Sequence, residues 1–160
     1  MKYKIMLVDD DKLILKALQR LLRKEGYQLI TALSAEEALN YLMNDPDVHV
    51  LISDHRMPKT TGMELLIEVR RLYPSIVRIL LTGHADMDTA IEGINKGRLY
   101  RFLTKPWQDA EVKEIVREAV QFWKAVAATR QVVEAVRETK KMQTQNLPPS
   151  AQKGVKVPKR

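Results

Sequence analysis

The feature that most constrains the fold is an alternation of strand-like and helix-like segments through residues 4–104. Short aliphatic and β-branched runs are each followed by a segment whose apolar residues recur every three or four positions. Five strands separated by helices, at intervals of roughly 20–25 residues, predict an α/β fold with a parallel sheet and helices on both faces. The predicted strands are residues 4–8, 28–32, 47–54, 75–83 and 99–104.

Residues that start or stop helices delimit the segments between these strands. Gly26 ends the apolar pattern that begins at Leu13. Ser34 is the expected N-cap of a helix that runs to Asn44, and Glu37 is placed to complete a capping box. The other two predicted helices are residues 63–72, closed by Pro74, and residues 87–95, closed by Gly97.

The last helical segment is unusually long, because residues 107–146 contain neither glycine nor proline. A single helix is predicted to begin near Asp109, its expected N-cap. Its apolar residues follow a heptad pattern, which indicates a coiled-coil seam whose first half packs on the sheet. The seam consists of Val112, Ile115, Ala119, Phe122, Val126, Thr129, Val133, Val136 and Lys140.

The second half of this helix has no obvious surface of its own domain to cover. Residues 124–145 are therefore predicted to be a helical extension that dimerises or transmits a signal as a coiled coil, with a solvated extension as the alternative. Residues 146–160 contain two adjacent prolines, a glycine and four basic residues but no acid. They predict a disordered basic tail or linker.

The net charge of +7 is concentrated at the end of the chain. Residues 1–123 contain 18 basic and 18 acidic side chains, whereas residues 124–160 contain 9 basic and 2 acidic ones. The basic pI therefore does not indicate a nucleic-acid-binding domain, and nucleic acid is not an expected partner. The chain has no cysteine, no apolar run near the ~20 residues of a membrane span and no signal peptide, which favours a cytoplasmic protein without a membrane partner.

Polar side chains lie at the ends of four of the predicted strands. In parallel α/β sheets the carboxyl ends of the strands meet at one edge, where ligands bind. We therefore expect these side chains to lie at one site. They are Asp9 and Asp10 after the first strand, Asp54 at the end of the third, Thr82 at the end of the fourth and Lys105 after the fifth.

The chemistry of these side chains suits phosphoryl transfer. Three carboxylates at one edge cannot all stay charged without a cationic partner. Mg²⁺ is the expected cofactor, because it prefers oxygen ligands and keeps several waters. A carboxylate beside such a metal can attack phosphorus, and the Lys105 ammonium and Thr82 hydroxyl are suited to bind phosphoryl oxygens. The residue types thus predict an acyl phosphate on one aspartate.

Four segments of the chain resemble the signature segments of the receiver domain of two-component response regulators. They are MLVDDD, LISDHRMPKTTGMELL, RILLTG and RFLTKPW, which occur in this order at the predicted strand ends. The resemblance covers residues 4–123. It implies a receiver domain over residues 1–123, with a flavodoxin-like sheet in the strand order 2-1-3-4-5.

The resemblance also implies a role for individual acids. Asp54 is the expected phospho-acceptor. Asp9 and Asp10 are the expected acidic pair that binds Mg²⁺, with Asp54 and the backbone carbonyl of Arg56 as further ligands. Asp11 lies outside this set and is predicted to cap the first helix, where an acid suits the positive end of the helix dipole.

The remaining signature residues lie after the fourth strand and around the fifth. Thr82 and Lys105 are expected to bind the phosphoryl group, and the Lys105–Pro106 bond is expected to be cis. Phe102 occupies the family's switch-aromatic position, although an aromatic residue in a strand is also an ordinary core residue.

Arg56 and His84 stand two residues after Asp54 and Thr82, at positions that influence phosphoryl hydrolysis in the family. We hypothesise that their side chains crowd the path of the attacking water and lengthen the phosphorylated lifetime.

The function that follows is a signalling switch rather than an enzyme. A sensor histidine kinase or phosphotransfer protein is expected to phosphorylate Asp54, and the domain assists this transfer and its reversal. The last helix is expected to pass the change to a second copy of the chain, as a homodimer, or to an output domain beyond Arg160.

Two other functional classes are weaker. In a haloacid-dehalogenase-like phosphatase, Asp9 would be the nucleophile and Asp11 its DxD partner, but Leu13 stands where that family prefers Thr or Val. Asp54 would also have no role. A DNA-binding factor would use the basic helix, whose charges between residues 124 and 139 are sparse and do not cluster.

Overall fold

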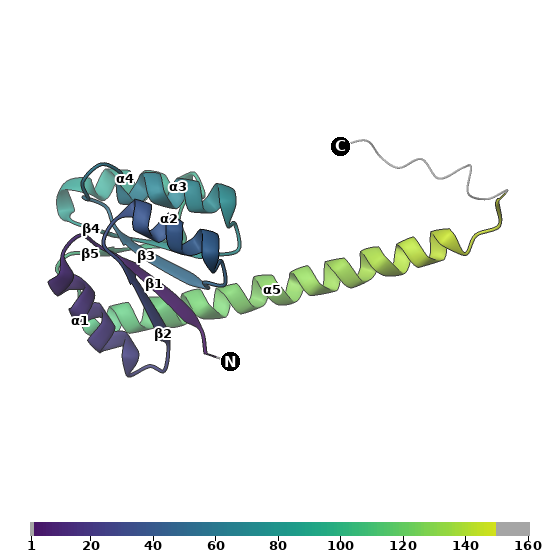
Figure 1. Cartoon of the computed structure of the whole chain (residues 1–160), viewed down its shortest axis with the longest axis horizontal. Helices are drawn as coiled ribbons and strands as arrows, with labels where there is room; N and C mark the ends of the chain where they lie inside the picture. The colour runs from purple at the N-terminus through teal and green to yellow at the C-terminus, as the bar shows by residue number, and fades with distance from the viewer. Residues whose placement is uncertain (1, 150–160) are drawn as a thin grey trace. The chain divides into compact units, whose positions relative to one another are not determined.

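Five parallel strands form one sheet in the order β2-β1-β3-β4-β5 (Figure 1). The computed structural model describes residues 2–149. The predicted fold class and strand order are confirmed. The strands are β1 (Lys4–Val8), β2 (Gln28–Ala32), β3 (Val50–Asp54), β4 (Val77–Thr82) and β5 (Arg101–Thr104). The helices are α1 (Lys12–Arg23), α2 (Ala35–Asn44), α3 (Gly62–Leu72), the short 3₁₀ helix η1 (His84–Asp86), α4 (Met87–Asn95) and α5 (Asp109–Gln145).

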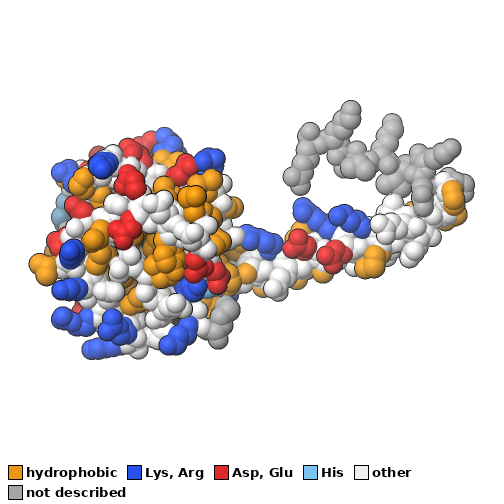
Figure 2. All heavy atoms as spheres, in the orientation of Figure 1, with side chains coloured by type: hydrophobic (Ala, Val, Ile, Leu, Met, Phe, Trp, Pro, Cys, Tyr) orange, Lys and Arg blue, Asp and Glu red, His pale blue; other side chains and the backbone are white. Residues whose placement is uncertain are grey.

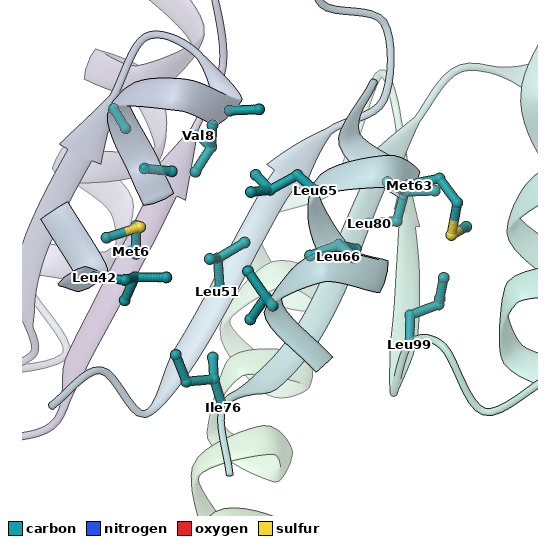
Figure 3. Close-up of a cluster of buried hydrophobic side chains, with 14 of the residues drawn as sticks. Met6, Val8, Leu42, Leu51, Met63, Leu65, Leu66, Ile76, Leu80 and Leu99 are labelled. Carbon is teal, nitrogen blue, oxygen red and sulfur yellow. The ribbon is translucent and has the colours of Figure 1, made fainter. Parts of the chain in front are cut away.

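Helices α2, α3 and α4 cover one face of the sheet (Figure 1). Alternate residues of the central strands point to this face, because successive side chains of a strand alternate between faces. Figure 3 shows these strand residues packed against the helices, with Leu65 and Leu66 of α3 in the middle. The strand residues are Met6 and Val8 of β1, Leu51 of β3 and Leu80 of β4.

Helix α1 and the first part of α5 cover the opposite face. The other set of strand residues packs there, including Ile5 and Leu7 of β1 and Ile52 of β3. All three are almost completely buried. Two apolar layers therefore enclose the sheet, and the polar chemistry is left to the edge where the strands end.

Side chains cap the helices that follow strands β1 and β2. The Asp11 carboxylate accepts a hydrogen bond from the N–H of Leu13 at 2.9 Å, so the predicted cap of α1 is confirmed. The Ser34 hydroxyl accepts from the N–H of Glu37 at 3.1 Å, as predicted. The Glu37 carboxylate reaches back one residue further than in a standard capping box and accepts from the N–H of Leu33.

Strands β3, β4 and β5 are shorter than predicted. Strand β3 begins at Val50 rather than Asp47, because the N–H of Val48 bonds to the carbonyl of Pro46 in a turn. Strand β4 covers Val77–Thr82, and β5 begins at Arg101. The carboxyl ends of the strands, where the polar residues lie, agree with the prediction to within one residue.

Helix α5 differs from its prediction at its N-terminus and along its packed face. The carbonyl of Gln108 accepts the first helical hydrogen bond, from Val112, so Gln108 is the N-cap and Asp109 lies inside the helix. Phe122 is 46% exposed and stacks on Tyr100 at 4.8 Å rather than entering the core. A helix on a sheet buries a broader stripe than a heptad seam. The buried residues are Val112, Val116, Ala119 and Val120.

The chain divides into two compact units, of which the first ends at Lys124 and the second begins at Ala125. The second unit consists of the remainder of α5 to Gln145 and the residues that follow. Charged and hydrophobic side chains share the surface of this part of α5 (Figure 2). Among residues 2–149, no helix combines the length and apolar character that a membrane span requires. Most of the predicted disordered tail, residues 150–160, lies outside the described residues.

Candidate functional site

Three carboxylates meet at the carboxyl edge of the sheet, as the strand pattern predicted. Asp9 and Asp10 follow β1, and Asp54 is the last residue of β3. One oxygen from each of the three lies within 4.8 Å of the others. Asp9 is 1% exposed and Asp54 7% exposed, whereas Asp10 is open to solvent. Two buried acids beside one accessible acid form a pocket that requires positive charge.

Lys105 supplies positive charge to the two buried acids. Its Nζ lies 3.0 Å from Asp9 Oδ2 and 2.9 Å from Asp54 Oδ1. The lysine follows β5 and is held there because its backbone N–H donates to the carbonyl of Thr82 at 2.8 Å. Burial alone would lower the pKa of Lys105, but the hydrogen bonds that its ammonium donates to Asp54 and Asp9 outweigh burial and raise this pKa above its ordinary value. Lys105 therefore remains an ammonium.

Asp9 is the acid most affected by this environment. Burial raises the pKa of Asp9, and the nearby charge of Asp54 acts in the same direction. The backbone N–H of Asp11, at 2.9 Å from Asp9 Oδ1, and the Lys105 ammonium oppose the shift. The net pKa of Asp9 lies above its ordinary value. A cation bound between these acids would relieve the same desolvation and repulsion.

The loop after β3 comes very close to the end of that strand. A Cβ atom at Gly62 would lie 2.0 Å from the backbone oxygen of Asp54, so only glycine fits there. The N–H of Gly62 also donates to the carbonyl of His55 at 2.8 Å. Within this loop Lys59 has a φ of 68°, an uncommon value for a residue with a side chain. The end of β3 and the start of α3 are thus held close together.

Arg56 and Asp86 form an ion pair that the sequence did not predict. Arg56 Nε donates to Asp86 Oδ2 at 2.7 Å. Both residues line the same open cavity as Asp54. His84, which was predicted to act with Arg56, also lines this cavity. Only the position of Asp86, in the polar segment after β4, could have suggested its place in the site.

Neither Thr82 nor Phe102 lines the cavity that contains the three acids. The Thr82 side chain is completely buried and its hydroxyl donates to the carbonyl of Gly83 at 3.2 Å. Phe102 is half-buried and packs against the apolar cluster beneath α2, α3 and α4. The Lys105–Pro106 peptide bond is cis, which confirms that prediction.

The family model that describes the response regulator receiver domain matches residues 5–117. The chain belongs to this family. The match runs from Ile5, the second residue of β1, through the other four strands to the first part of α5. The recognition drawn from the four signature segments is therefore confirmed.

This receiver is similar to parts of transcriptional regulators and to solved receiver structures. The hydrogenase transcriptional regulatory protein HoxA of Cupriavidus necator is 39% identical over 117 residues, which are 73% of this chain and 24% of that protein. The signal receiver domain of an HD domain-containing protein from Pseudomonas fluorescens is 37% identical, with a TM-score of 0.74 over 79% of this chain and 93% of that one. A structure titled adenylate cyclase from Rhodopirellula baltica is 31% identical, with a TM-score of 0.80 over 84% and 98% of the two chains.

The chain spans about a quarter of the length of HoxA. Its likeness to that regulator is thus a likeness of receiver domains. The geometry of this receiver brings three carboxylates and an ammonium to one open cavity. Such an arrangement can hold a divalent cation and position a phosphoryl group beside Asp54.

Proposed function

We propose that the chain is a phospho-acceptor switch, in which a sensor histidine kinase or a phosphotransfer protein transfers a phosphoryl group to Asp54. The observation that carries this proposal is the convergence of Asp9, Asp10 and Asp54 on one cavity, with the Lys105 ammonium 2.9 Å from Asp54. Membership of the receiver family supports it. The chain is not an enzyme that turns over a substrate, because its own side chain accepts the phosphoryl group.

The donor set fits Mg²⁺. Carboxylate oxygens are hard ligands, and the three acids lie close enough for one cation to contact a single oxygen from each. Asp9, Asp10 and Asp54 would hold the ion, with the backbone carbonyl of Arg56 as the further ligand that the family resemblance implies. Bound there, Mg²⁺ supplies positive charge that offsets the negative charge of the phosphoryl oxygens.

Different residues of the chain have different roles in the phosphoryl transfer. A carboxylate oxygen of Asp54 forms a bond to phosphorus while the bond from phosphorus to the donor's histidine nitrogen breaks, and the nitrogen keeps the electron pair. Lys105 already lies beside Asp54 and contacts the incoming phosphoryl oxygens. The Thr82 hydroxyl turns from the carbonyl of Gly83 to do the same. Phe102, in the neighbouring strand, responds to this movement of Thr82.

The phosphatase alternative is less compatible with these contacts. The nucleophile in that case would be Asp9, whose side chain is 2% exposed and paired with Lys105. Its DxD partner would be Asp11, whose side chain caps α1. Asp54 is the more accessible of the two buried acids.

The experiment is phosphorylation of the purified chain by acetyl phosphate with Mg²⁺, followed by intact-mass measurement and peptide mapping. We expect a gain of one phosphoryl group on Asp54, and no gain in Asp54→Asn or after chelation of Mg²⁺. Asp11→Asn is the matched control, because it removes a neighbouring charge and asparagine retains the helix cap. Equal labelling of Asp54→Asn, or transient labelling of Asp9, would refute the proposal.

The hypothesis on the phosphorylated lifetime is tested on the same material. Arg56 and His84 both line the cavity of Asp54, and we infer that they can restrict the approach of water to the acyl phosphate. We expect the acyl phosphate to decay faster in Arg56→Asn and in His84→Ala than in the unmodified chain. Unchanged or slower decay in both variants would end the idea.

The last helix carries the response. Val126, Val133 and Val136 are exposed at heptad spacing in α5 and suit packing against a second copy of the chain, as a homodimer. The curated relatives are longer regulatory proteins, so an output domain beyond this chain is part of the proposal, as is a cytoplasmic location. Sedimentation equilibrium tests the dimer: Val133→Lys is expected to weaken self-association, and a concentration-independent monomer would contradict it.

A further inference from the structure

The ion pair between Arg56 and Asp86 joins two loops at the cavity of the acceptor. Arg56 lies two residues after Asp54 in the β3–α3 loop, and Asp86 ends η1 between β4 and α4. Besides the 2.7 Å bond from Nε, Arg56 Nη2 donates to Asp86 Oδ1 at 3.4 Å. Both side chains line the cavity that also contains Asp9, Asp10 and Asp54. The guanidinium is therefore at the acceptor's cavity but bonded to another acid.

The Arg56–Asp86 ion pair is weak enough for the guanidinium to change partner. The Arg56 side chain is 74% exposed, and an ion pair with so exposed a partner is weak. Two hydrogen bonds, from Nε and from Nη2, hold the Arg56 guanidinium at the Asp86 carboxylate. No other acid among residues 2–149 forms an ion pair with Arg56.

A phosphoryl group on Asp54 brings a competitor for the same guanidinium. It adds negative charge and acceptor oxygens, which planar guanidinium groups bind in bidentate fashion. Lys105 is already shared between Asp9 and Asp54, which makes Arg56 the second strong cation that lines the cavity. The acyl phosphate and Asp86 thus compete for one side chain.

We propose that Asp86 is a positioning residue that holds the Arg56 guanidinium away from the phosphoryl group of Asp54 and so shortens the phosphorylated lifetime. The inference rests on the proposed function. In hydrolysis the oxygen of water bonds to phosphorus, the bond from phosphorus to Asp54 breaks, and the products are the carboxylate, inorganic phosphate and a proton. A guanidinium on the phosphoryl oxygens obstructs that water. The more strongly Asp86 binds Arg56, the less time the guanidinium spends on the phosphoryl oxygens, and the more easily water reaches phosphorus.

The neighbouring acids do not share this role. Asp11 lines the same cavity, but its carboxylate caps α1 through the N–H of Leu13. Asp9 and Asp54 bind Lys105. Asp86 is the N-cap residue of α4, but its side chain makes no capping hydrogen bond. A change at Asp86 therefore alters the position of Arg56 without removing a carboxylate ligand of the expected cation or a side-chain helix cap.

The test is the decay of the acyl phosphate after labelling with acetyl phosphate and removal of the donor, with Mg²⁺ present throughout. We expect Asp86→Asn to slow decay roughly two- to fivefold, the range that loss of an exposed ion pair permits. Asp86→Glu keeps the charge and is expected to decay close to the unmodified rate. In an Arg56→Ala background, Asp86→Asn is expected to change nothing, because the guanidinium is absent.

Glu68→Gln is the matched control. Glu68 pairs with Arg71 on the surface of α3, so its substitution also removes a carboxylate from an exposed arginine without touching the cavity. Asp86→Ser removes the carboxylate a second way if Asp86→Asn does not fold.

The outcomes separate this inference from the function on which it rests. Equal or faster decay of both Asp86→Asn and Asp86→Ser would overturn the role of Asp86. Slower decay that persists in Arg56→Ala would overturn it as well, because the effect would then pass through another group. A chain that takes up no label at Asp54 in any variant would refute the phospho-acceptor function itself.

Discussion

Two parts of helix α5 both contain valines at helical spacing, but these valines are buried in the first part and exposed in the second. In the first part, Val116 and Val120 are 0% and 4% exposed against the sheet. In the part that belongs to the second unit, Val132 and Val133 are 63% and 45% exposed. Valine at helical spacing is common to both. What differs is the environment, because the valines of the first part pack against apolar side chains of the sheet.

Apolar residues at helical spacing therefore show that a helix has a face that can be buried. They do not show that another surface covers that face. Most of the stability of a protein helix comes from burial of its apolar face, and isolated helices shorter than about 12–15 residues are marginal in water even for alanine-rich sequences. Residues 125–145 are longer than this but contain, within the described chain, no buried apolar residue. Their helix therefore depends on propensity, on continuity with the first part of α5 and on any partner that covers Val132 and Val133.

Amide hydrogen exchange is expected to give the largest contrast between the two regions. Amides of β1 and β3 open only with global unfolding, which costs on the order of 5–15 kcal/mol in ordinary domains. Amides of residues 126–145 are expected to exchange many orders of magnitude faster in the monomer. Protection of both regions to the same degree at low concentration would break the comparison, and protection that appears only at high concentration would sharpen it.

Aspartate substitutions at matched valines test the same contrast in stability. Val116→Asp places a charge in the buried face and is expected to lower the free energy of unfolding by about 4 kcal/mol or more. Val133→Asp, in the exposed part, is expected to change it by no more than about 0.5 kcal/mol. Urea denaturation followed by tryptophan fluorescence measures both. Equal destabilisation by the two variants, measured on the monomer, would contradict the contrast between the buried and the exposed valines.

The next largest contrast is expected when one methyl group is added in the first unit or removed in the second. Gly62→Ala forces a Cβ to within 2.0 Å of the Asp54 backbone oxygen, and the resulting displacement is expected to cost about 2–3 kcal/mol. Ala135→Gly removes a methyl group from α5 and is expected to cost about 1 kcal/mol of local helix stability. The unfolding midpoint should fall in the first variant and hold in the second. A midpoint for Gly62→Ala equal to that of the unmodified chain would contradict this close approach.

The pH dependence of stability is expected to show the smallest effect, through His49. This buried histidine accepts a hydrogen bond from the N–H of Lys4 at 3.0 Å and packs edge-on against Tyr3 and Trp123. Burial lowers its pKa below the ordinary value of 6.5. The unfolded chain then binds its proton first, so stability is lost as the pH falls from 6.5 through the lowered pKa, at about 1.4 kcal/mol per unit of difference.

His49→Gln is the variant that isolates this contribution, because a glutamine oxygen can still accept from Lys4 without titrating. We expect its free energy of unfolding to fall less than that of the unmodified chain between neutral and mildly acidic pH. Parallel curves for the two proteins would show that His49 does not titrate on unfolding. Because His49 packs on Trp123, near the end of the first unit, the measurement also probes how firmly that end is held.

The sequence was sufficient for the architecture and for the residues at the ends of the strands. Periodicity of two and of 3.6 separates strands from helices, and the rule for parallel sheets brings Asp9, Asp54 and Lys105 together without any coordinates. It could not reveal the pairing of Arg56 with Asp86, because a flexible surface side chain can reach several acids. Nor could it show that Gly62 lies against Asp54, since a glycine before a helix has several ordinary explanations.

The errors along α5 have a similar cause. A heptad pattern gave Phe122 a place in the packed seam, whereas the flat face of a sheet accepts Val116 and Val120 beside Val112 and leaves Phe122 at the margin with Tyr100. Sequence periodicity identifies an apolar stripe, and the shape of the opposing surface decides its width.

The ammonium of Lys105 gives the resting molecule an internal counter-ion. Because it pairs with Asp9, which follows β1, and with Asp54 at the end of β3, it offsets part of the negative charge of the acidic edge before any ligand arrives. The lysine side chain is flexible, so the ammonium can turn toward an incoming anion. The same charge can therefore pair with the acids when no anion is present and with the anion when one is bound. An arginine at this position could also pair with the two acids, but its rigid planar guanidinium would turn less easily toward an incoming anion.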